Sequence, residues 1–254
     1  MRSATLAIIL ATLAIPDPIT AQDHTAFSTL LAGYVTPSPD GLNRVDYDRW
    51  RSNPDDRKAL DAYISGLEAT AVSTLPRDER FAFWANLYNA VTVRLILDEN
   101  PSRSIRQIRP HPFAFGPWGA KRVTVEGKRL SLDNIEHDIL RATFNDPRVH
   151  YALNCASIGC PDLGTRAWEA ATLEEDLNSG ARAYVNHPRG VTVTKKGLRI
   201  SKIYNWFRED FGDSTDGVIE HLLPYANDEL KAAIRANPRI DGHQYNWDLN
   251  RVER

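Results

Sequence analysis

Two cysteines and a histidine lie close together in the segment spanning residues 146–163. Cys155 and Cys160 are the only cysteines of the 254-residue chain, and His150 precedes them. A cysteine nucleophile needs a base that removes its proton, a group that orients the base, and donors that bind the oxyanion. Two thiols so close in sequence can also pair with each other. The segment therefore indicates thiol chemistry, a disulfide, or both.

Cys155 is the better candidate for a nucleophile. We interpret the apolar residues 149–153 as a strand that ends just before Cys155, where a turn or a helix begins. Free backbone N–H groups at such a position would lower the pKa of a thiol and could bind an oxyanion. Cys160 is followed by Pro161 and is expected in a loop. The alternatives are a structural Cys155–Cys160 disulfide and two inert buried thiols.

The base can come from either of two histidines. In a straight strand, His150 would lie roughly 16 Å from Cys155 at about 3.3 Å per residue, which favours His137, a residue of a separate element. If the chain turns sharply before Cys155, His150 can be the base and Glu136 can orient it. Glu136 cannot orient His137, because adjacent residues on one helix do not face each other. We prefer the arrangement with His137 as base, and both stay open.

These side chains also have structural interpretations. Glu136 lies three residues after Asp133 and can complete a capping box with it. His137 can pair with Asp133 or Arg141 on the same helix. His150 can be a buried histidine whose hydrogen bonds are satisfied. Catalytic and structural roles are therefore both open at these positions.

Four polar residues are candidates for substrate binding: Asn86, Asn89, Asn154 and Ser157. Asn86 and Asn89 are three residues apart in an apolar helical run, so they share one face. They either tether neighbouring loops or form a polar wall of a site. Asn154 and Ser157 flank Cys155 and can contact substrate or an oxyanion, or can simply form a turn.

The elements that must position these residues are mostly helices. The strongest is 76–100, which is apolar nearly all round and is expected to be the central buried helix. Further helices are predicted at 55–67, 131–144, 172–186, 201–211, 217–223 and 228–237, hairpins at 122–130 and 191–200, and an extended segment at 240–250. Two hairpins among helices, without regular strand–helix alternation, predict a helix-rich α+β single domain with a small antiparallel sheet.

The N-terminal segment resembles a secretory signal peptide. Met1 and Arg2 precede an apolar run of about a dozen residues, too short to span a bilayer, and a small-residue exit at Thr20-Ala21. We expect residues 1–21 to be removed and residues 22–254 to form the mature domain. The protein is then periplasmic or secreted, where disulfides can form. No later segment is apolar enough to span a membrane.

Composition excludes several classes of function. The formal net charge of −2, with 42% hydrophobic and 25% charged residues, is that of an ordinary globular protein with no electrostatic case for nucleic acid. The spacing of Cys155, Cys160 and the upstream histidines matches no tight pair of zinc ligands. No phosphate-binding loop or dinucleotide fingerprint is present. We therefore expect neither a metal nor a cofactor.

The sequence resembles the DUF547 family, a domain of unknown function, in five separate motifs along residues 81–250. They are FWANLYNA at 83–90, SLDNIEHDILR at 131–141, DPRVHYALNCASIGCPDL at 146–163, SKIYNWFREDF at 201–211 and YNWDLN at 245–250. The resemblance implies a papain-like or transglutaminase-like core with a circularly permuted strand order. Papain-like enzymes place an oxyanion donor a few residues before the cysteine, so the resemblance gives His150 that role when His137 is the base.

The resemblance implies a cysteine hydrolase or acyltransferase acting on a peptide-like or small amide substrate. Relatives that lack the cysteine or the histidine look like scaffolds, whereas this sequence keeps Glu136, His137, His150, Cys155 and Cys160. The alternative is a non-catalytic interaction domain with a structural disulfide. Its protein partner would dock on the aromatic loop 111–118.

Overall fold

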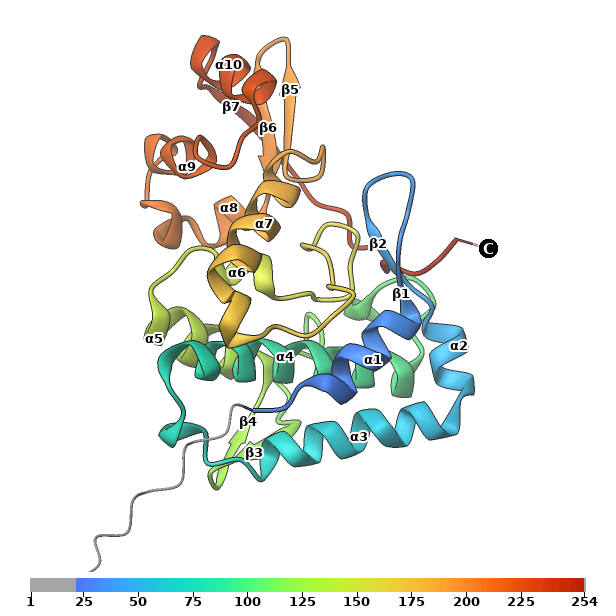
Figure 1. Ribbon diagram of the computed structural model, residues 1–254. Coiled ribbons are helices and arrows are strands. Elements are labelled where there is room, and N and C mark those ends of the chain that lie inside the picture. Colours follow the sequence, from blue (N-terminus) through green and yellow to red (C-terminus); the bar gives the residue numbers. More distant parts are fainter. Residues whose placement is uncertain (1–21, 254) are drawn as a thin grey trace, which may run out of the picture.

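The longest helix, α4 (Arg77–Glu99), lies at the centre of the first half of the fold (Figure 1). Acidic residues occupy its first turn, and Asn100 ends it in a left-handed conformation. Between residues 81 and 97 every side chain except Arg94 is buried. The prediction of a central buried helix is confirmed, because a helix that is apolar on all sides needs neighbours all round.

The computed structural model describes residues 22–253, so the predicted signal peptide at 1–21 lies outside the described residues. The predicted helix-rich α+β class is confirmed. The elements before α4 are α1 (Thr25–Tyr34), β1 (Val35–Pro37), β2 (Asn43–Val45), α2 (Tyr47–Ser52), α3 (Pro54–Glu68) and η1 (Val72–Thr74). Among residues 22–253, no helix is long and apolar enough to cross a membrane.

The middle of the chain folds against α4 and leads to the cysteines. Its elements are η2 (Ile105–Gln107), the hairpin β3 (Val123–Val125) and β4 (Lys128–Leu130), η3 (Asn134–Arg141), α5 (Ala142–Phe144), α6 (Val149–Ala152), η4 (Ala170–Thr172) and α7 (Leu173–Val185). The hairpin is where we predicted it. The predicted helix 131–144 is largely π-helical, because η3 is a π-helix that runs into α5.

The last third of the chain forms a separate layer above the first (Figure 1). Its elements are β5 (Val191–Thr194), β6 (Gly197–Ser201), α8 (Ile203–Trp206), η5 (Arg208–Phe211), α9 (Thr215–Leu222), α10 (Asp228–Ala236) and β7 (Ile240–Gln244). The predicted helix 201–211 is split into α8 and η5. The predicted antiparallel sheet is mixed, because β7 returns after three helices and pairs parallel with β6.

Two hydrophobic cores result. The larger surrounds α4, and the smaller lies between α7, the three-stranded sheet and α8 to α10. The cysteine segment 146–163 runs between them. The papain-like core and the permuted strand order stay predictions.

Candidate functional site

The segment before the cysteines is helical, so the predicted strand at 149–153 is wrong. α6 forms one turn, in which the N–H groups of Val149 and His150 donate to the carbonyls of Asp146 and Pro147. The Asp146 carboxylate starts this turn by accepting the N–H of Arg148 at 2.8 Å. A helical turn is more compact than a strand. The separation of roughly 16 Å expected for a strand therefore does not apply to His150 and Cys155.

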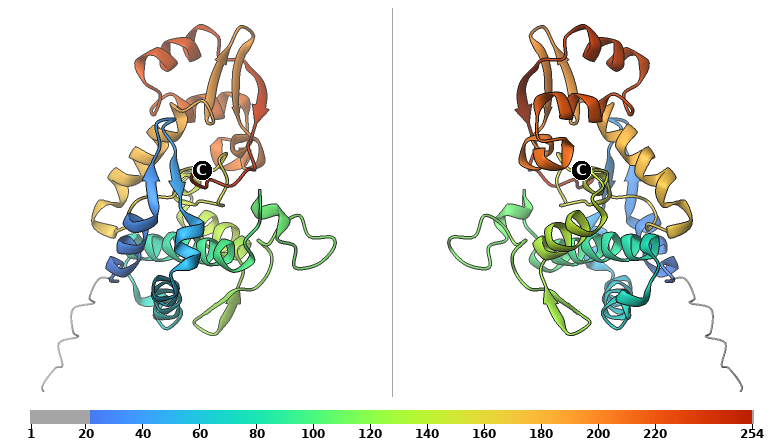
Figure 2. Two further views of the ribbon diagram at one scale, coloured as in Figure 1. Left: turned by 90° about the vertical axis from the view of Figure 1, so that its right-hand side faces the viewer. Right: turned by 90° about the vertical axis from the view of Figure 1, so that its left-hand side faces the viewer.

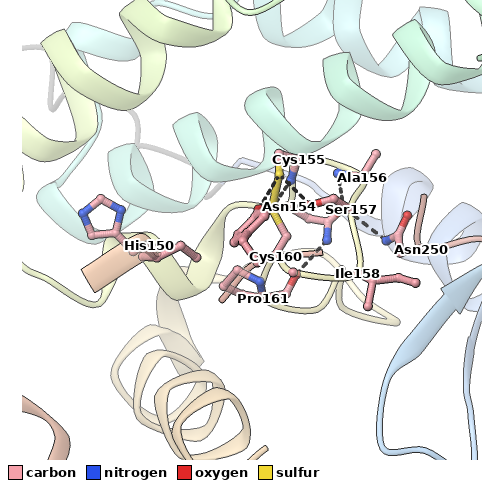
Figure 3. Close-up of a disulfide and its surroundings, with 12 residues drawn as sticks. His150, Asn154, Cys155, Ala156, Ser157, Ile158, Cys160, Pro161 and Asn250 are labelled. Atoms are coloured by element: carbon pink, nitrogen blue, oxygen red, sulfur yellow. Dashed lines mark hydrogen bonds between the residues drawn. A yellow bond between two sulfur atoms is a disulfide. The ribbon is translucent and has the colours of Figure 1, made fainter. Parts of the chain in front are cut away.

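Cys155 and Cys160 are joined by a disulfide, with their Cα atoms 6.1 Å apart (Figure 3). Cys160 is buried, and Cys155 is partly exposed. Within the part of the chain that the structure describes, no cysteine is free. Of the alternatives that the sequence left open for this pair, the structure shows the disulfide.

The backbone around Cys155 does not supply the free N–H groups expected from the sequence. Cys155 does not begin a helix, and its own N–H donates to Cys160 Sγ at 3.0 Å. The N–H of Ala156 donates to Asn154 Oδ1 at 2.9 Å, and Ala156 has a left-handed φ of 60°. A tight turn satisfied by a side chain takes the place of the expected helix end. The proposed backbone oxyanion site is thus absent from residues 155 and 156.

Two hydroxyl groups surround the sulfur atoms instead. The Tyr245 hydroxyl lies 3.2 Å from Cys155 Sγ and 3.2 Å from Cys160 Sγ, and Ser157 Oγ lies 3.3 Å from Cys155 Sγ. The two hydroxyls are 3.0 Å apart. Burial raises the pKa of the Tyr245 phenol, so it keeps its proton and remains able to donate.

His150 is held by an acidic partner that the sequence did not reveal. Its side chain is 2% exposed, its ring stacks on Phe207 at 4.3 Å, and its Nε2 lies 2.6 Å from Asp210 Oδ2. Burial alone would raise the pKa of Asp210, but hydrogen bonds from His150 and Arg141 outweigh it and lower that pKa to about 2. Asp210 is therefore an ionised carboxylate that orients the imidazole. Asp210 lies in the motif at 201–211, and its place in that motif is the sequence feature that could have identified it as a site residue.

The second nitrogen of His150 faces Glu136, with Nδ1 4.0 Å from Oε1. Asp133 makes no capping hydrogen bond, so the predicted capping box with Glu136 is wrong. Glu136 instead lies beside the buried phenol of Tyr88, whose pKa is raised by burial and further by this carboxylate. Figure 3 shows His150 to one side of the disulfide.

His137 makes the local pairs expected of a residue on the flank of a helix. Its Nε2 lies 3.8 Å from Asp133 Oδ1, and its Nδ1 lies 3.4 Å from a guanidinium nitrogen of Arg141. Its side chain is 36% exposed. Neither predicted arrangement describes the structure fully: His137 makes only local pairs, and the carboxylate hydrogen-bonded to His150 belongs to Asp210 rather than to Glu136. The catalytic roles of both histidines stay predictions.

Of the four candidate substrate-binding residues, the three asparagines are buried tethers, and the Ser157 hydroxyl lies beside the Cys155 sulfur. Asn86 exchanges two hydrogen bonds of 2.9 Å with the backbone of Trp168. Asn89 donates to the carbonyl of Ala152 and accepts from the N–H of Asn154, both at 2.9 Å. The Asn154 side chain also donates to the carbonyl of Pro161 at 2.7 Å. Neither these three asparagines nor Ser157 line the cavity described next.

A cavity of about 170 Å³ lies between the two cores. Four candidates from the sequence line it: Glu136, His137, His150 and Cys155. Residues that we did not single out complete it: Tyr88, Trp118, Asp133, Leu153, Cys160, Pro161, Ile203, Trp206, Phe207, Tyr245 and Trp247. Among the described residues, no group of three or more His, Cys, Asp or Glu side chains is arranged to hold a metal ion.

Comparison with protein families finds a match over part of the chain. Residues 72–185 match the model of DUF547, described as a protein of unknown function. This range includes the motifs at 83–90, 131–141 and 146–163, whereas those at 201–211 and 245–250 lie beyond it. Comparisons with curated proteins and with solved structures find no match.

Proposed function

Since residues 72–185 of this chain belong to the DUF547 family, whose function is unknown, we propose that the protein is a thiol-dependent hydrolase or acyltransferase of peptide-like amides. One observation carries the proposal: His150, which is hydrogen-bonded to Asp210, lines the same cavity as Cys155. A carboxylate that orients a histidine beside a cysteine is the arrangement that activates a thiol nucleophile. In this proposal the disulfide is the resting form.

The active form arises by reduction. A dithiol reductant gives up two electrons and two protons, the Cys155–Cys160 bond breaks to two thiols, and the reductant leaves as a disulfide. His150 Nε2 stays bonded to Asp210, so Nδ1, which faces Glu136 across the cavity, is the nitrogen left to take the proton of Cys155. The thiolate is stabilised by hydroxyl groups of Tyr245 and Ser157, since hydrogen bonds to the charged form lower a pKa.

The thiolate then attacks the amide carbonyl. The Tyr245 hydroxyl is the donor best placed near the sulfur to hold the oxyanion. His150 returns its proton to the leaving amine, which leaves a thioester on Cys155. In the second step, water or an amine acceptor attacks the thioester while His150 takes its proton. The thiolate of Cys155 leaves and regains that proton, which completes hydrolysis or acyl transfer.

We also infer that the protein works in an oxidising compartment. The disulfide supports this inference, because such bonds persist in secreted and periplasmic proteins. The signal peptide predicted at residues 1–21 agrees with it.

Alkylation of the reduced protein tests the proposal. In Cys160→Ser, where Cys155 is the single thiol, we expect iodoacetamide to react at pH 7 at least about tenfold faster than with an ordinary cysteine. Asp210→Asn in that background should slow the reaction, because His150 loses its ionised partner. Asp213→Asn is the matched control, since Asp213 is exposed and pairs with the exposed Arg208 at 3.5 Å. A Cys155 that reacts no faster than an ordinary thiol would sink the proposal.

A specific observation favours a second candidate, a non-catalytic interaction domain with a structural disulfide. The loop that precedes β3 projects from the body (green in Figure 2). Phe113 and Phe115 on this loop are 89% and 85% exposed. Contiguous exposed apolar patches mark contact sites for partners, and these two neighbouring rings would form the centre of such a patch. A partner whose capture is unaffected by Cys155→Ser but abolished by Phe113→Ser or Phe115→Ser would support this candidate, and capture insensitive to the phenylalanines would count against it.

A further inference from the structure

Aromatic rings form one side of the cavity. Trp206 of α8 lies 4.8 Å from Tyr245 and 5.5 Å from Trp247, measured between ring centroids, and Tyr245 lies 4.6 Å from Trp247. Trp118 adds a fourth ring, 5.8 Å from Trp247. All four rings line the cavity. The faces of such rings are electrostatically negative and attract cations.

Two carboxylates line the same cavity from the start of η3. Among the described residues, the ion-pair partners of Asp133 and Glu136 are histidines only: His137 at 3.8 Å and His150 at 4.0 Å, respectively. No lysine or arginine belongs to the lining. The lining therefore holds two carboxyl groups and no guanidinium or ammonium group of its own, although Arg106 and Arg141 lie over the rings of Trp247 and Phe207 at 5.1 and 4.9 Å.

We propose that this cavity binds an organic ammonium group, held by the aromatic rings and by the carboxylates of Asp133 and Glu136. The size agrees, because a cavity of about 170 Å³ is close to the roughly 150 Å³ that holds benzene in an engineered protein. If the protein acts on an amide as proposed above, the substrate carries a cationic group near the bond that reacts. This statement about the substrate rests on the proposed function. Binding itself does not require a reduced Cys155.

Binding of choline to the oxidised full-length protein tests the proposal. The neutral comparison is 3,3-dimethyl-1-butanol, which has the same shape without the charge. Calorimetry, together with tryptophan fluorescence, should show choline binding at least about tenfold more tightly, as expected for a cation among aromatic rings. Glu136→Gln and Trp206→Leu should each weaken choline binding by about fivefold or more.

Asp138→Asn is the matched control, because Asp138 lies on the same helix but is exposed and does not line the cavity. It should leave choline binding unchanged, and all variants should retain the wild-type thermal unfolding profile. Equal affinity for the two probes, no binding of choline, or an equal loss in Asp138→Asn and Glu136→Gln would overturn the proposal. Because the disulfide stays intact here, a failure of thiol reactivity leaves this result unaffected, and a failure of binding leaves the alkylation result unaffected.

Discussion

At the scale of residues, the choice between His137 and His150 depends on their partners. His150 has an ionised carboxylate at 2.6 Å and a stacked aromatic ring, so its orientation is fixed. His137 pairs with residues of its own helix. A catalytic base must be positioned as well as titratable. The sequence identified both histidines as candidate bases, but it could not show that Asp210, 60 residues after His150, is hydrogen-bonded to that histidine.

Two buried histidines outside the cavity predict a loss of stability in acid. Burial lowers the pKa of His24 and of His221 to about 4, from an ordinary 6.5. The unfolded chain therefore binds protons that the folded chain does not between these values. We expect the free energy of unfolding to be highest above pH 6.5 and to fall towards pH 4, by up to roughly 3 kcal/mol for each histidine.

Urea denaturation between pH 8 and pH 4.5 measures this dependence. His221→Gln should flatten the profile even if it lowers stability overall, because the pH slope depends on titration alone. Asp210 does not confuse the result, since its lowered pKa of about 2 removes stability only as the pH falls below about 3.8. A wild-type profile that is flat between pH 7 and pH 5 would contradict the prediction.

At the scale of elements, α4 positions the cysteine segment through Asn89. This side chain satisfies the carbonyl of Ala152, where α6 ends, and the N–H of Asn154, the residue before Cys155. Asn86, one turn earlier, makes an equivalent pair of bonds to Trp168, which belongs to a different loop. Substitutions of the two asparagines can therefore be compared directly, because the side chains make similar bonds from one helix to two different loops.

We predict that Asn89→Ala and Asn86→Ala cost similar stability but differ at the site. Each change leaves two backbone groups without their partner, buried ones for Asn89 and partly buried ones for Asn86, at about 1–3 kcal/mol per group. Only Asn89→Ala should alter the rate at which the disulfide is reduced by dithiothreitol, because only Asn89 holds the backbone beside Cys155. Equal reduction rates in the two variants, with equal losses of stability in urea, would refute the positioning role.

The sequence predicted the long elements well and the short ones poorly. α4 and the two hairpins carry their own signals: a continuous apolar helix, and alternation around Glu126-Gly127 and Lys196-Gly197. α6 was misread because four apolar residues suit a buried strand or a buried helical turn equally well. The π-helical stretch η3 and the parallel pairing of β7 with β6 depend on contacts between distant segments, which no local pattern encodes.

At the scale of the whole molecule, the cavity exists because two cores meet around it. The larger core, around α4, contributes Tyr88 and Leu153 to the cavity lining. The smaller core contributes Ile203, and Phe207 packs against it. The thiol and histidine components of the site could be predicted from residue type and spacing. Its aromatic wall could not, because that wall requires the C-terminal segment to return across the molecule.

Where the C-terminal segment returns to the cysteine segment, Gly159 and Asn246 are too close for a side chain at residue 159. The N–H of Gly159 donates to the carbonyl of Asn246 at 2.8 Å, and a Cβ atom at Gly159 would lie 2.9 Å from two backbone atoms of Asn246 and from the Tyr245 ring. Gly180 in α7 is the matched control, because a Cβ there would meet Tyr151 at an ordinary 3.6 Å.

We therefore predict opposite effects for the same substitution. Gly159→Ala should push the C-terminal segment away, lower stability by about 1–3 kcal/mol and weaken choline binding, because Tyr245 and Trp247 move with that segment. Gly180→Ala should raise stability by about 0.5–1 kcal/mol, since alanine is the better helix former, and leave binding unchanged. Chemical denaturation and calorimetry of both variants measure these effects. A stable Gly159→Ala protein with wild-type binding would show that the C-terminal segment does not need this close contact to hold the aromatic wall in place.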